Sequence, residues 1–384
     1  MRRAGFAFRL EHRALDSRAR SGVFTTPHGE VPTPAFMPVG TRGTVKGVLP
    51  RDLREAGTRI VLANAYHLHL RPGEETVRSL GGLHRFMGWD GPILTDSGGY
   101  QVFSLSDSVR VDDDGATFRS IVDGRSVRFT PERAVDVQRA LGADVAMAFD
   151  HCTAEPGARA EVERAADRTH RWLERCVRRH REHGGEETGQ ALFGIVQGGA
   201  FEDLRRASVD SVCSHDLAGY AIGGVSVGEP REAVLAAIES AAPRLPEDRP
   251  RYLMGVGMPI DFIDAVERGV DLFDCVTPTR HGRTHQAFTS QGVLNLRNAA
   301  FAADPRPLDA RCGCPACAGF SRAYLRHLCK AGEMLGAVLL TLHNLRHFQS
   351  LFGRIRAGIA EGSLAPLRAE VVASSVKRGS EVQW

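Results

Sequence analysis

LFGIVQGGAFEDLRRASVDSVCSHDLAGYAIGGV, residues 192 to 225, contains two short apolar runs separated by a segment of helical period. The runs 192–199 and 219–225 consist almost entirely of apolar residues and glycine, as strands covered on both faces do. Between them, FEDLRRASVDSV has its apolar residues at the spacing of one helix face. We therefore expect a strand, a helix and a second strand parallel to the first, because parallel neighbours need a crossover of this length.

The same alternation recurs along the whole chain. Helix-period segments separate most of the apolar runs, and several begin with Pro and end with Gly, as helix ends prefer. Eight right-handed crossovers close into a (β/α)8 TIM barrel, so the predicted fold class is α/β. An open dinucleotide-binding sheet is the alternative, but no strand-to-helix turn supplies its three-glycine loop. The eight predicted strands are 34–39, 59–66, 92–97, 144–150, 192–199, 219–225, 251–257 and 272–278.

Two segments interrupt the alternation and define the expected domains. Residues 1–300 should form the catalytic barrel, with a hairpin insertion at 104–129. Residues 301–350 contain a cysteine cluster and are expected to be a zinc-binding subdomain, inserted near the C-terminal end. Residues 351–384 should supply a helix and a polar tail that complete the barrel exterior.

Composition limits the class of protein. With 384 residues, 42% of them hydrophobic, the chain can bury a large core, and its net charge of +3 neither requires nor excludes nucleic acid. Charges throughout the first residues leave no apolar core for a signal peptide, and no run is long enough for a membrane span. We expect a cytoplasmic protein without membrane contact, in which the eight cysteines serve metal binding or catalysis rather than disulfides.

The segment RCGCPACAG, residues 311–319, places Cys312, Cys314 and Cys317 within six residues. Thiolates at this spacing converge on a tetrahedral ion, and the fourth ligand should come from another segment. His343 in TLHNLRHF is the preferred candidate, although spacing alone leaves His347 as an alternative. Four protein ligands leave no position for a catalytic water, so we expect one structural Zn²⁺ per subunit.

Three predicted strands end in a carboxylate, namely Asp96, Asp150 and Asp274. In a barrel these ends form one face, which is where catalysis takes place. A pocket with carboxylates, an amide and bare backbone N–H groups at Gly-Gly pairs suits a planar heterocycle such as a purine, and two carboxylates can break a glycosidic bond with retention. The same level also holds Gln197, Gly224, Met254 and Gly255, with Tyr100 nearby for packing. Single strand-end aspartates often cap helices instead.

Two other functional classes are compatible with parts of the sequence. His67 and His69 in YHLHL lie near a strand end, and metal-dependent amidohydrolases built on this barrel use such a pair with a last-strand aspartate, here Asp274. The ends of the fourth to sixth strands carry no histidine to complete that site, although His151 is adjacent to one. A non-catalytic RNA-binding protein is the third possibility.

The sequence resembles the bacterial-type tRNA-guanine transglycosylases, also called queuine tRNA-ribosyltransferases. The blocks ILTDSGGYQVFSL, FGIVQGG, GYAIGGVSVGEP, RYLMGVG, LFDCVTPTR, CGCPAC and TLHNL look like those of that family, in its order and spacing. NAYHLHLRPG also belongs to its pattern, which accounts for His67 and His69 without a catalytic metal.

The resemblance implies a base exchange in queuosine biosynthesis. Asp274 would attack C1′ of guanosine at the anticodon wobble position, position 34 of the tRNA, and 7-aminomethyl-7-deazaguanine (preQ1) would then replace guanine on the enzyme-bound ribose. Asp96 would act as general acid and base, with Ser97 beside it. Recognition of the base would involve Asp150, Gln197, the Gly224 N–H and the Val225 carbonyl, with Tyr100 and Met254 on either side of the ring.

The resemblance also implies partners, and one of the places where this sequence departs from the family pattern bears on the substrate. Arg280 and Arg283 would meet anticodon-loop phosphates, the zinc-bearing segment would help to bind tRNA, and the protein would form a homodimer. Cys152 and Val227 would be wall residues of the base pocket. His151 stands where the family usually has Glu, so a charged imidazole there would put the preference for cationic preQ1 in doubt.

Overall fold

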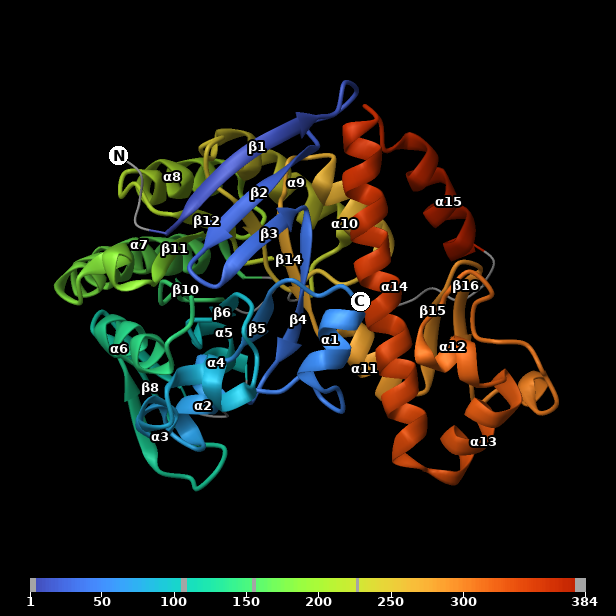
Figure 1. Ribbon diagram of the computed structural model, residues 1–384. Coiled ribbons are helices and arrows are strands. Elements are labelled where there is room, and N and C mark those ends of the chain that lie inside the picture. Colours follow the sequence, from blue (N-terminus) through green and yellow to red (C-terminus); the bar gives the residue numbers. More distant parts are fainter. Residues whose placement is uncertain (1–4, 105–108, 154–156, 226–227, 377–384) are drawn as a thin grey trace.

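The computed structural model describes residues 5–104, 109–153, 157–225 and 228–376. Eight parallel strands close into a barrel in chain order, and each overlaps one of the eight predicted apolar runs (Figure 1). The predicted TIM barrel is therefore confirmed. The barrel strands are β4 (Ala35–Gly40), β5 (Val61–Ala63), β6 (Ile93–Thr95), β10 (Val145–Met147), β11 (Ala191–Val196), β12 (Gly219–Ile222), β13 (Arg251–Leu253) and β14 (Leu272–Cys275).

Helices connect these strands on the outside of the barrel. Helix α6 (Pro131–Leu141) illustrates the local signals: Thr130 accepts a hydrogen bond from the N–H of Arg133, Pro131 opens the first turn, and Gly142 ends the helix at φ 74°. No helix within the described residues is both long and apolar enough to cross a membrane. The other connecting helices are α1 (Pro50–Glu55), α2 (Ala65–Leu70), α3 (Glu74–Ser79), α4 (Gly82–Met87), α5 (Gly99–Ser104), α7 (Arg159–Glu182), α8 (Glu202–Cys213), α9 (Arg231–Ala241) and α10 (Pro259–Val266).

A three-stranded antiparallel sheet that the sequence analysis did not predict precedes the barrel. It consists of β1 (Ala7–Arg13), β2 (Arg20–Thr26) and β3 (Gly29–Thr33). Phe24 and Val31 belong to the same buried cluster as barrel-interior side chains such as Phe193. At the turn between β2 and β3, His28 hydrogen-bonds Asp144 directly before β10. The sheet thus lies at the amino-terminal end of the barrel, opposite the carboxyl ends where chemistry is expected.

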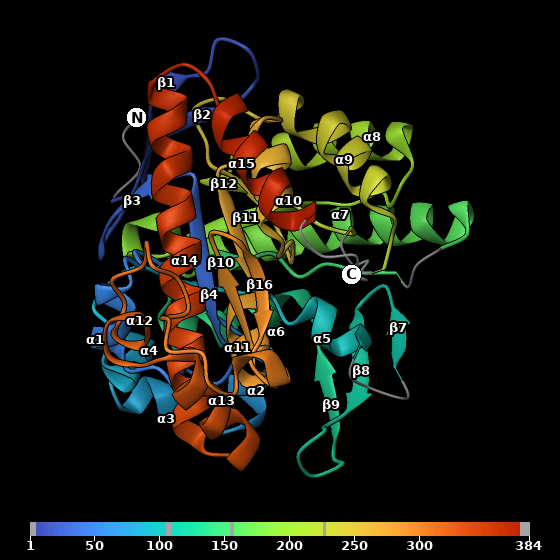
Figure 2. The same cartoon turned by 90° about the vertical axis from the view of Figure 1, so that its right-hand side faces the viewer.

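The insertion between β6 and β10 contains the expected hairpin and one further antiparallel strand before it. The three strands are β7 (Arg110–Asp112), β8 (Gly115–Arg119) and β9 (Ser126–Phe129), and Figure 2 shows them extending from the barrel beside α5. Asp113, in the turn between β7 and β8, accepts hydrogen bonds from Arg168 and Arg171 of α7. Its backbone carbonyl also accepts a bond from Trp172, so the insertion is fastened to α7.

The chain after β14 forms a separate lobe and then returns to the barrel (Figure 1). Helix α14 runs without interruption from the cysteine-containing lobe along the barrel wall, across the predicted boundary at residue 350. Phe348 and Phe352 of this helix pack against Phe36 and Phe262. One helix therefore belongs to both parts of the protein. The elements of this region are α11 (Thr277–Arg283), β15 (Gln286–Thr289), β16 (Gly292–Asn295), α12 (Pro315–Gly319), α13 (Arg322–Ala331), α14 (Met334–Ala360) and α15 (Ala365–Val376).

Candidate active site and metal site

Asp96 lies directly after β6 and is buried. One carboxylate oxygen accepts a hydrogen bond from the backbone N–H of Ala65, at 2.8 Å, and the other accepts one from the side-chain amide of Asn64. Burial raises the pKa of Asp96 to about 7, and the negative charge of Asp274 contributes to that rise. A carboxyl group with such a pKa can both give and take a proton near neutral pH.

Asp274 lies on β14 and is held through a single oxygen. Its Oδ1 accepts a 2.6 Å hydrogen bond from the phenol of Tyr252 and a 3.0 Å bond from the N–H of Gly255. Oδ2 receives no hydrogen bond from a described residue. Burial raises the pKa of Asp274, while the Tyr252 bond acts in the opposite direction by stabilising the carboxylate. The two bonds orient the group and leave one oxygen free to react.

Asp150 lies after β10 and connects to the neighbouring strand ends. It accepts hydrogen bonds from the Ser97 hydroxyl at 3.1 Å, from the Gln197 amide at 2.7 Å and from the Cys152 thiol at 3.3 Å. Ser97, which binds Asp150, directly follows Asp96 in the chain. The charge of Asp274 raises the pKa of Asp96, so these two carboxylates are also close. The structure therefore brings the three predicted carboxylates to one face of the barrel. The prediction that these strand ends converge is therefore supported by their contacts.

At two positions the backbone passes so close to the side chains of Gln197 and Asp150 that only glycine fits. A Cβ at Gly224, whose φ is 61°, would lie 2.1 Å from Oε1 of Gln197. A Cβ at Gly99 would lie 2.4 Å from Oδ1 of Asp150. A side chain at either position would displace the amide or the carboxylate, so glycine keeps the floor of the pocket open.

The remaining predicted pocket residues surround this face. Tyr100, on α5, is half exposed, which leaves its ring available to a ligand. A Cβ at Gly223 would lie 3.7 Å from Sδ of Met254, so that side chain lies beside the Gly223–Gly224 turn. Val225 is buried directly after the turn. Val227 lies outside the described residues.

Three supporting side chains were missed by the sequence analysis. Asn64 and Tyr252 hold the two central carboxylates. Arg205 of α8, which is fully buried, donates to the carbonyls of Gly199, Gly223 and Gly224 and so fixes the turns that form the floor. Asn64 stands at a predicted strand end and could have been noticed there. Arg205 stands four and seven residues before Val209 and Val212, so its position on the apolar helix face could have marked it.

A group of exposed cations lies beside the carboxylates. Arg280 and Arg283 are on α11, which follows the strand of Asp274 directly. Partial burial lowers the pKa of Lys46, and the charges of Arg283, Arg42 and Arg280 lower it further, so the three arginines lie near Lys46. Arg42 and Lys46, in the loop after β4, were not predicted. Such a cluster favours a polyanion at the barrel mouth.

Cys312, Cys314, Cys317 and His343 have their ligand atoms within 4.8 Å of one another. Nδ1 of His343 lies 3.5 Å from Sγ of Cys314 and 3.3 Å from Sγ of Cys317, close to the edge of about 3.5 Å expected for a tetrahedral zinc site. Nε2 of His343 hydrogen-bonds the Phe288 carbonyl at 2.7 Å, which leaves Nδ1 for the metal. His347 lies outside this group. The four predicted ligands fit a metal ion.

The metal-dependent hydrolase alternative finds no support among the described residues. His69 pairs with Glu74 at 2.7 Å. Neither His67 nor His69 belongs to a group of side chains close enough to share a metal ion within the described parts of the chain. The second such group, His28, His84 and Asp144, lies at the amino-terminal end of the barrel.

Comparisons with known proteins identify the family of this chain. A model of the family described as queuine tRNA-ribosyltransferase matches residues 16–377. The chain belongs to the queuine tRNA-ribosyltransferase family. The queuine tRNA-ribosyltransferase of Thermus thermophilus is 55% identical over 357 residues, which cover 93% of this chain and 91% of that protein. The Cereibacter sphaeroides and Desulforamulus reducens family members are 53% and 51% identical, each covering more than nine tenths of both chains.

Proposed function

We propose that the protein exchanges guanine at position 34 of tRNA for preQ1, through a covalent bond between Asp274 and the ribose, in queuosine biosynthesis. The proposal rests on one observation: two carboxylates at the mouth of the barrel differ in their hydrogen bonds and in their pKa values. Asp274 is oriented through Oδ1 by Tyr252 and Gly255, and Oδ2 receives no hydrogen bond from the parts of the chain that the structure describes. Asp96 has a pKa of about 7. One group is suited to form a bond and the other to transfer a proton.

In the first half-reaction, Oδ2 of Asp274 forms a bond to C1′ as the bond from C1′ to N9 of guanine breaks. The electron pair goes to guanine, which takes a proton from neutral Asp96. In the second half-reaction, Asp96 accepts the N9 proton of preQ1, N9 attacks C1′, and the carboxylate of Asp274 leaves. Two displacements at C1′ retain its configuration.

Recognition of the purine would use the floor and walls of the pocket. Asp150 accepts from N1–H and the exocyclic amine, while the Gln197 amide and the Gly224 N–H donate to the carbonyl oxygen. The half-exposed ring of Tyr100 and the side chain of Met254 cover the two faces of the base. The target nucleotide has to be turned out of its stack to reach this pocket. The further predicted contacts are Ser97, which holds Asp150, the Val225 carbonyl, which accepts from the aminomethyl group, and Gly255, which orients Asp274.

His151 is compatible with a cationic incoming base. Burial and the neighbouring charge of Arg168 lower the pKa of His151 to about 4, so its ring is neutral near pH 7. The ring packs against Phe103, at 4.7 Å between centroids, and Nδ1 accepts from Arg168 at 3.2 Å. His151 therefore places no charge of its own opposite the aminomethyl group of preQ1. It gives no electrostatic obstacle to preQ1, although His151 stands where the family usually has Glu.

We propose zinc as the ion held by the four-ligand group, one per subunit. Three thiolates and one imidazole are the donor set of structural zinc sites. When bound, zinc would join the loop of Cys312 to helix α14 and hold the segment 301–350 against the barrel. It supplies a cross-link and leaves the chemistry to the carboxylates.

The expected partners are tRNA and a second copy of the chain. Arg280 and Arg283, with Arg42 and Lys46, would contact the phosphates of the anticodon loop and position it without reading its sequence. The homodimer is proposed from the family resemblance, and exposed apolar side chains such as Phe86, Tyr324 and Met334 are candidate contacts for it. Because tRNA is its proposed substrate, we propose a cytoplasmic location.

The decisive experiment is exchange of labelled guanine into tRNA by the wild-type protein and by Asp274→Ala. The wild type should incorporate label at position 34, whereas the variant should lose at least about a thousandfold in rate while it still binds tRNA. Equal rates would exclude Asp274 as the nucleophile. Binding of tRNA without exchange by the wild type would favour the RNA-binding alternative. Competition among preQ1, queuine and guanine then determines the incoming base.

A further inference from the structure

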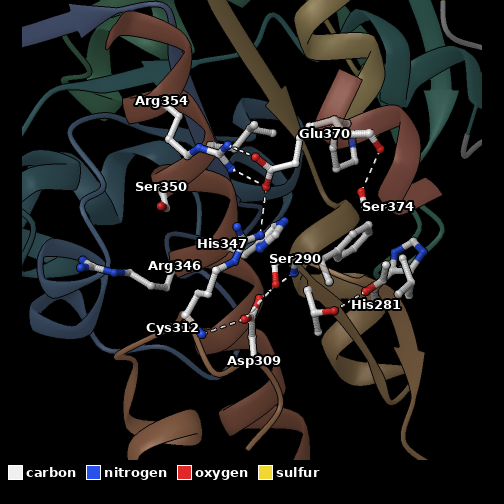
Figure 3. Close-up of a pocket in the computed structure, with 18 of the residues that line it drawn as sticks. His281, Ser290, Asp309, Cys312, Arg346, His347, Ser350, Arg354, Glu370 and Ser374 are labelled. Atoms are coloured by element: carbon white, nitrogen blue, oxygen red, sulfur yellow. Dashed lines mark hydrogen bonds and ion pairs between the residues drawn. The ribbon is translucent and has the colours of Figure 1, made fainter. Parts of the chain in front are cut away.

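A large cavity lies between the cysteine-containing lobe, α14 and α15, away from the predicted active site (Figure 3). Its volume is about 780 Å³, which is large enough for a small organic molecule. Arg346, His347 and Ser350 of α14 form one wall, and Glu370 of α15 closes another side by pairing with Arg354. None of the three strand-end carboxylates lines it, so the cavity is not part of the base pocket.

The cavity reaches the metal-binding group at one ligand. Cys312 lines the cavity and is partly exposed, whereas Cys314, Cys317 and His343 are 4%, 8% and 0% exposed. Asp309, on the same loop, also lines the cavity, and its backbone carbonyl accepts a hydrogen bond from the N–H of Cys312. The four ligands therefore differ in access: one borders solvent-accessible space and three are enclosed.

The enclosed ligands are also held by secondary structure. Cys314 caps α12 and Cys317 lies inside that helix, with its N–H bonded to the Cys314 carbonyl. His343 lies in the middle of α14, with Nε2 bonded to Phe288. Cys312 precedes these elements on a loop, so its side chain can leave the metal without moving a helix. A metal site needs an entry path, and an exposed thiolate is the reactive one.

We propose that Cys312 is the exchangeable ligand of the metal site and that the cavity is the route by which a thiophilic divalent ion, and small thiol-directed reagents, reach it. The inference rests on the zinc assignment proposed above. It makes Cys312 a modification site at which a small electrophile acts before it reaches the other two thiols. The ion exchanges by detachment of Cys312, while the other three ligands stay in place.

Gly313 allows a direct test, because it lines the cavity next to Cys312. A Cβ there would meet nothing within 4 Å, and the residue has no left-handed φ. Gly319, in the same lobe, is equally open but lies outside the cavity lining, so Gly319→Phe is a matched control. Ser350→Phe, on the α14 wall of the cavity, is a second blocking variant if Gly313→Phe fails to fold.

Zinc content is measured first, and release of zinc into excess chromogenic chelator is then followed below the melting temperature. Blocking the cavity should slow release about tenfold, equivalent to about 1.4 kcal/mol of added barrier, while Gly319→Phe should release zinc like the wild type. Equal rates in all proteins, or release at the rate of global unfolding, would overturn the proposed route.

Alkylation of the metal-free protein with iodoacetamide provides an independent measurement. Peptide mass mapping should find Cys312 modified before Cys314 and Cys317, and Gly313→Phe should delay that modification. Reaction of all three thiols at one rate contradicts the inference. If the protein binds no zinc but still shows this order, the accessibility of Cys312 stands and the cofactor assignment fails, which separates the two proposals.

Discussion

The phenol of Tyr252 donates a 2.6 Å hydrogen bond to Oδ1 of Asp274 on the adjacent barrel strand. Tyr252 is fully buried, and its hydroxyl and the N–H of Gly255 contact the same carboxylate oxygen. The bond stabilises the ionised carboxylate and fixes its plane, so it prepares Oδ2 for attack at a sugar carbon. Tyr252 is therefore expected to act on catalysis through Asp274.

Tyr252→Phe should lower kcat about tenfold to a hundredfold, because the carboxylate loses its orientation. KM for tRNA should change little, since Tyr252 is buried behind Asp274. Steady-state guanine exchange measures both constants. Tyr220→Phe is the control: this buried tyrosine on the preceding strand β12 binds the Leu217 N–H instead of a carboxylate. A similar loss of kcat in both variants would indicate a general effect of removing buried hydroxyls.

The native state should lose stability as the pH rises because of Asp96. Folding raises its pKa from 3.8 to about 7, so the folded chain binds a proton that the unfolded chain has released between those values. The free energy of unfolding therefore falls by about 1.4 kcal/mol for each pH unit across this window, and the contribution of Asp96 stays constant above about pH 7. Asp96→Asn cannot ionise and should not show this fall. Urea unfolding of both proteins at pH 5 and pH 8 tests the difference, and parallel changes would contradict the raised pKa.

Gly224→Ala should weaken base binding more than it weakens the fold. The new methyl group would lie 2.1 Å from Oε1 of Gln197 and displace the amide that contacts Asp150. We expect KM for guanine to rise at least about tenfold, with a smaller change in KM for tRNA. Gly353→Ala on α14, where a Cβ meets nothing closer than 3.9 Å, is the control and should behave like the wild type.

Arg168→Ala should raise KM for guanine about threefold to tenfold, because His151 loses its hydrogen-bond partner beside Asp150. Removal of the Arg168 charge should also raise the pKa of His151. Arg171→Ala is a matched control, since Arg171 pairs with the same Asp113 but makes no described contact with His151. If both variants have the same KM, the effect comes from fastening the insertion rather than from His151.

His343→Ala should abolish zinc binding and lower Tm by at least about 5 °C, because a structural metal site contributes to folding. Exchange activity should fall, whereas calorimetric binding of guanine should persist in the fraction that remains folded. His347→Ala should retain zinc, as its side chain is outside the ligand group. Elemental analysis and thermal unfolding measure both effects. Loss of zinc in His347→Ala alone would reverse the assignment of the fourth ligand.

The barrel could be predicted because its strands are buried on both faces. Residues such as those of β11, Ala191–Val196, are all buried, and that produces an uninterrupted apolar run. The sheet β1–β3 escaped prediction because its first strand, Ala7–Arg13, has no fully buried residue and carries four charged or histidine side chains in AFRLEHR. A strand that covers its neighbours but is itself exposed to solvent has no uninterrupted apolar run by which it could be found.

The site could be predicted where chemistry requires a rare arrangement. Three cysteines within six residues, or an aspartate directly after an apolar strand, are visible in the sequence. Arg205 was missed because arginine is rarely fully buried, although it lies four residues before Val209 on the buried helix face; only the fold shows that it contacts carbonyls. The importance of Tyr252 depends likewise on the register between β13 and β14.

The uninterrupted course of α14 has a consequence for protein engineering. The same helix carries His343 to the cysteine group and, one to three turns later, Phe348 and Phe352 to the barrel wall. A chimera that takes its metal-binding lobe from a relative cannot be spliced within this helix without misaligning one of those two attachments. The transferable unit extends from the strand of Asp274 through the end of α14.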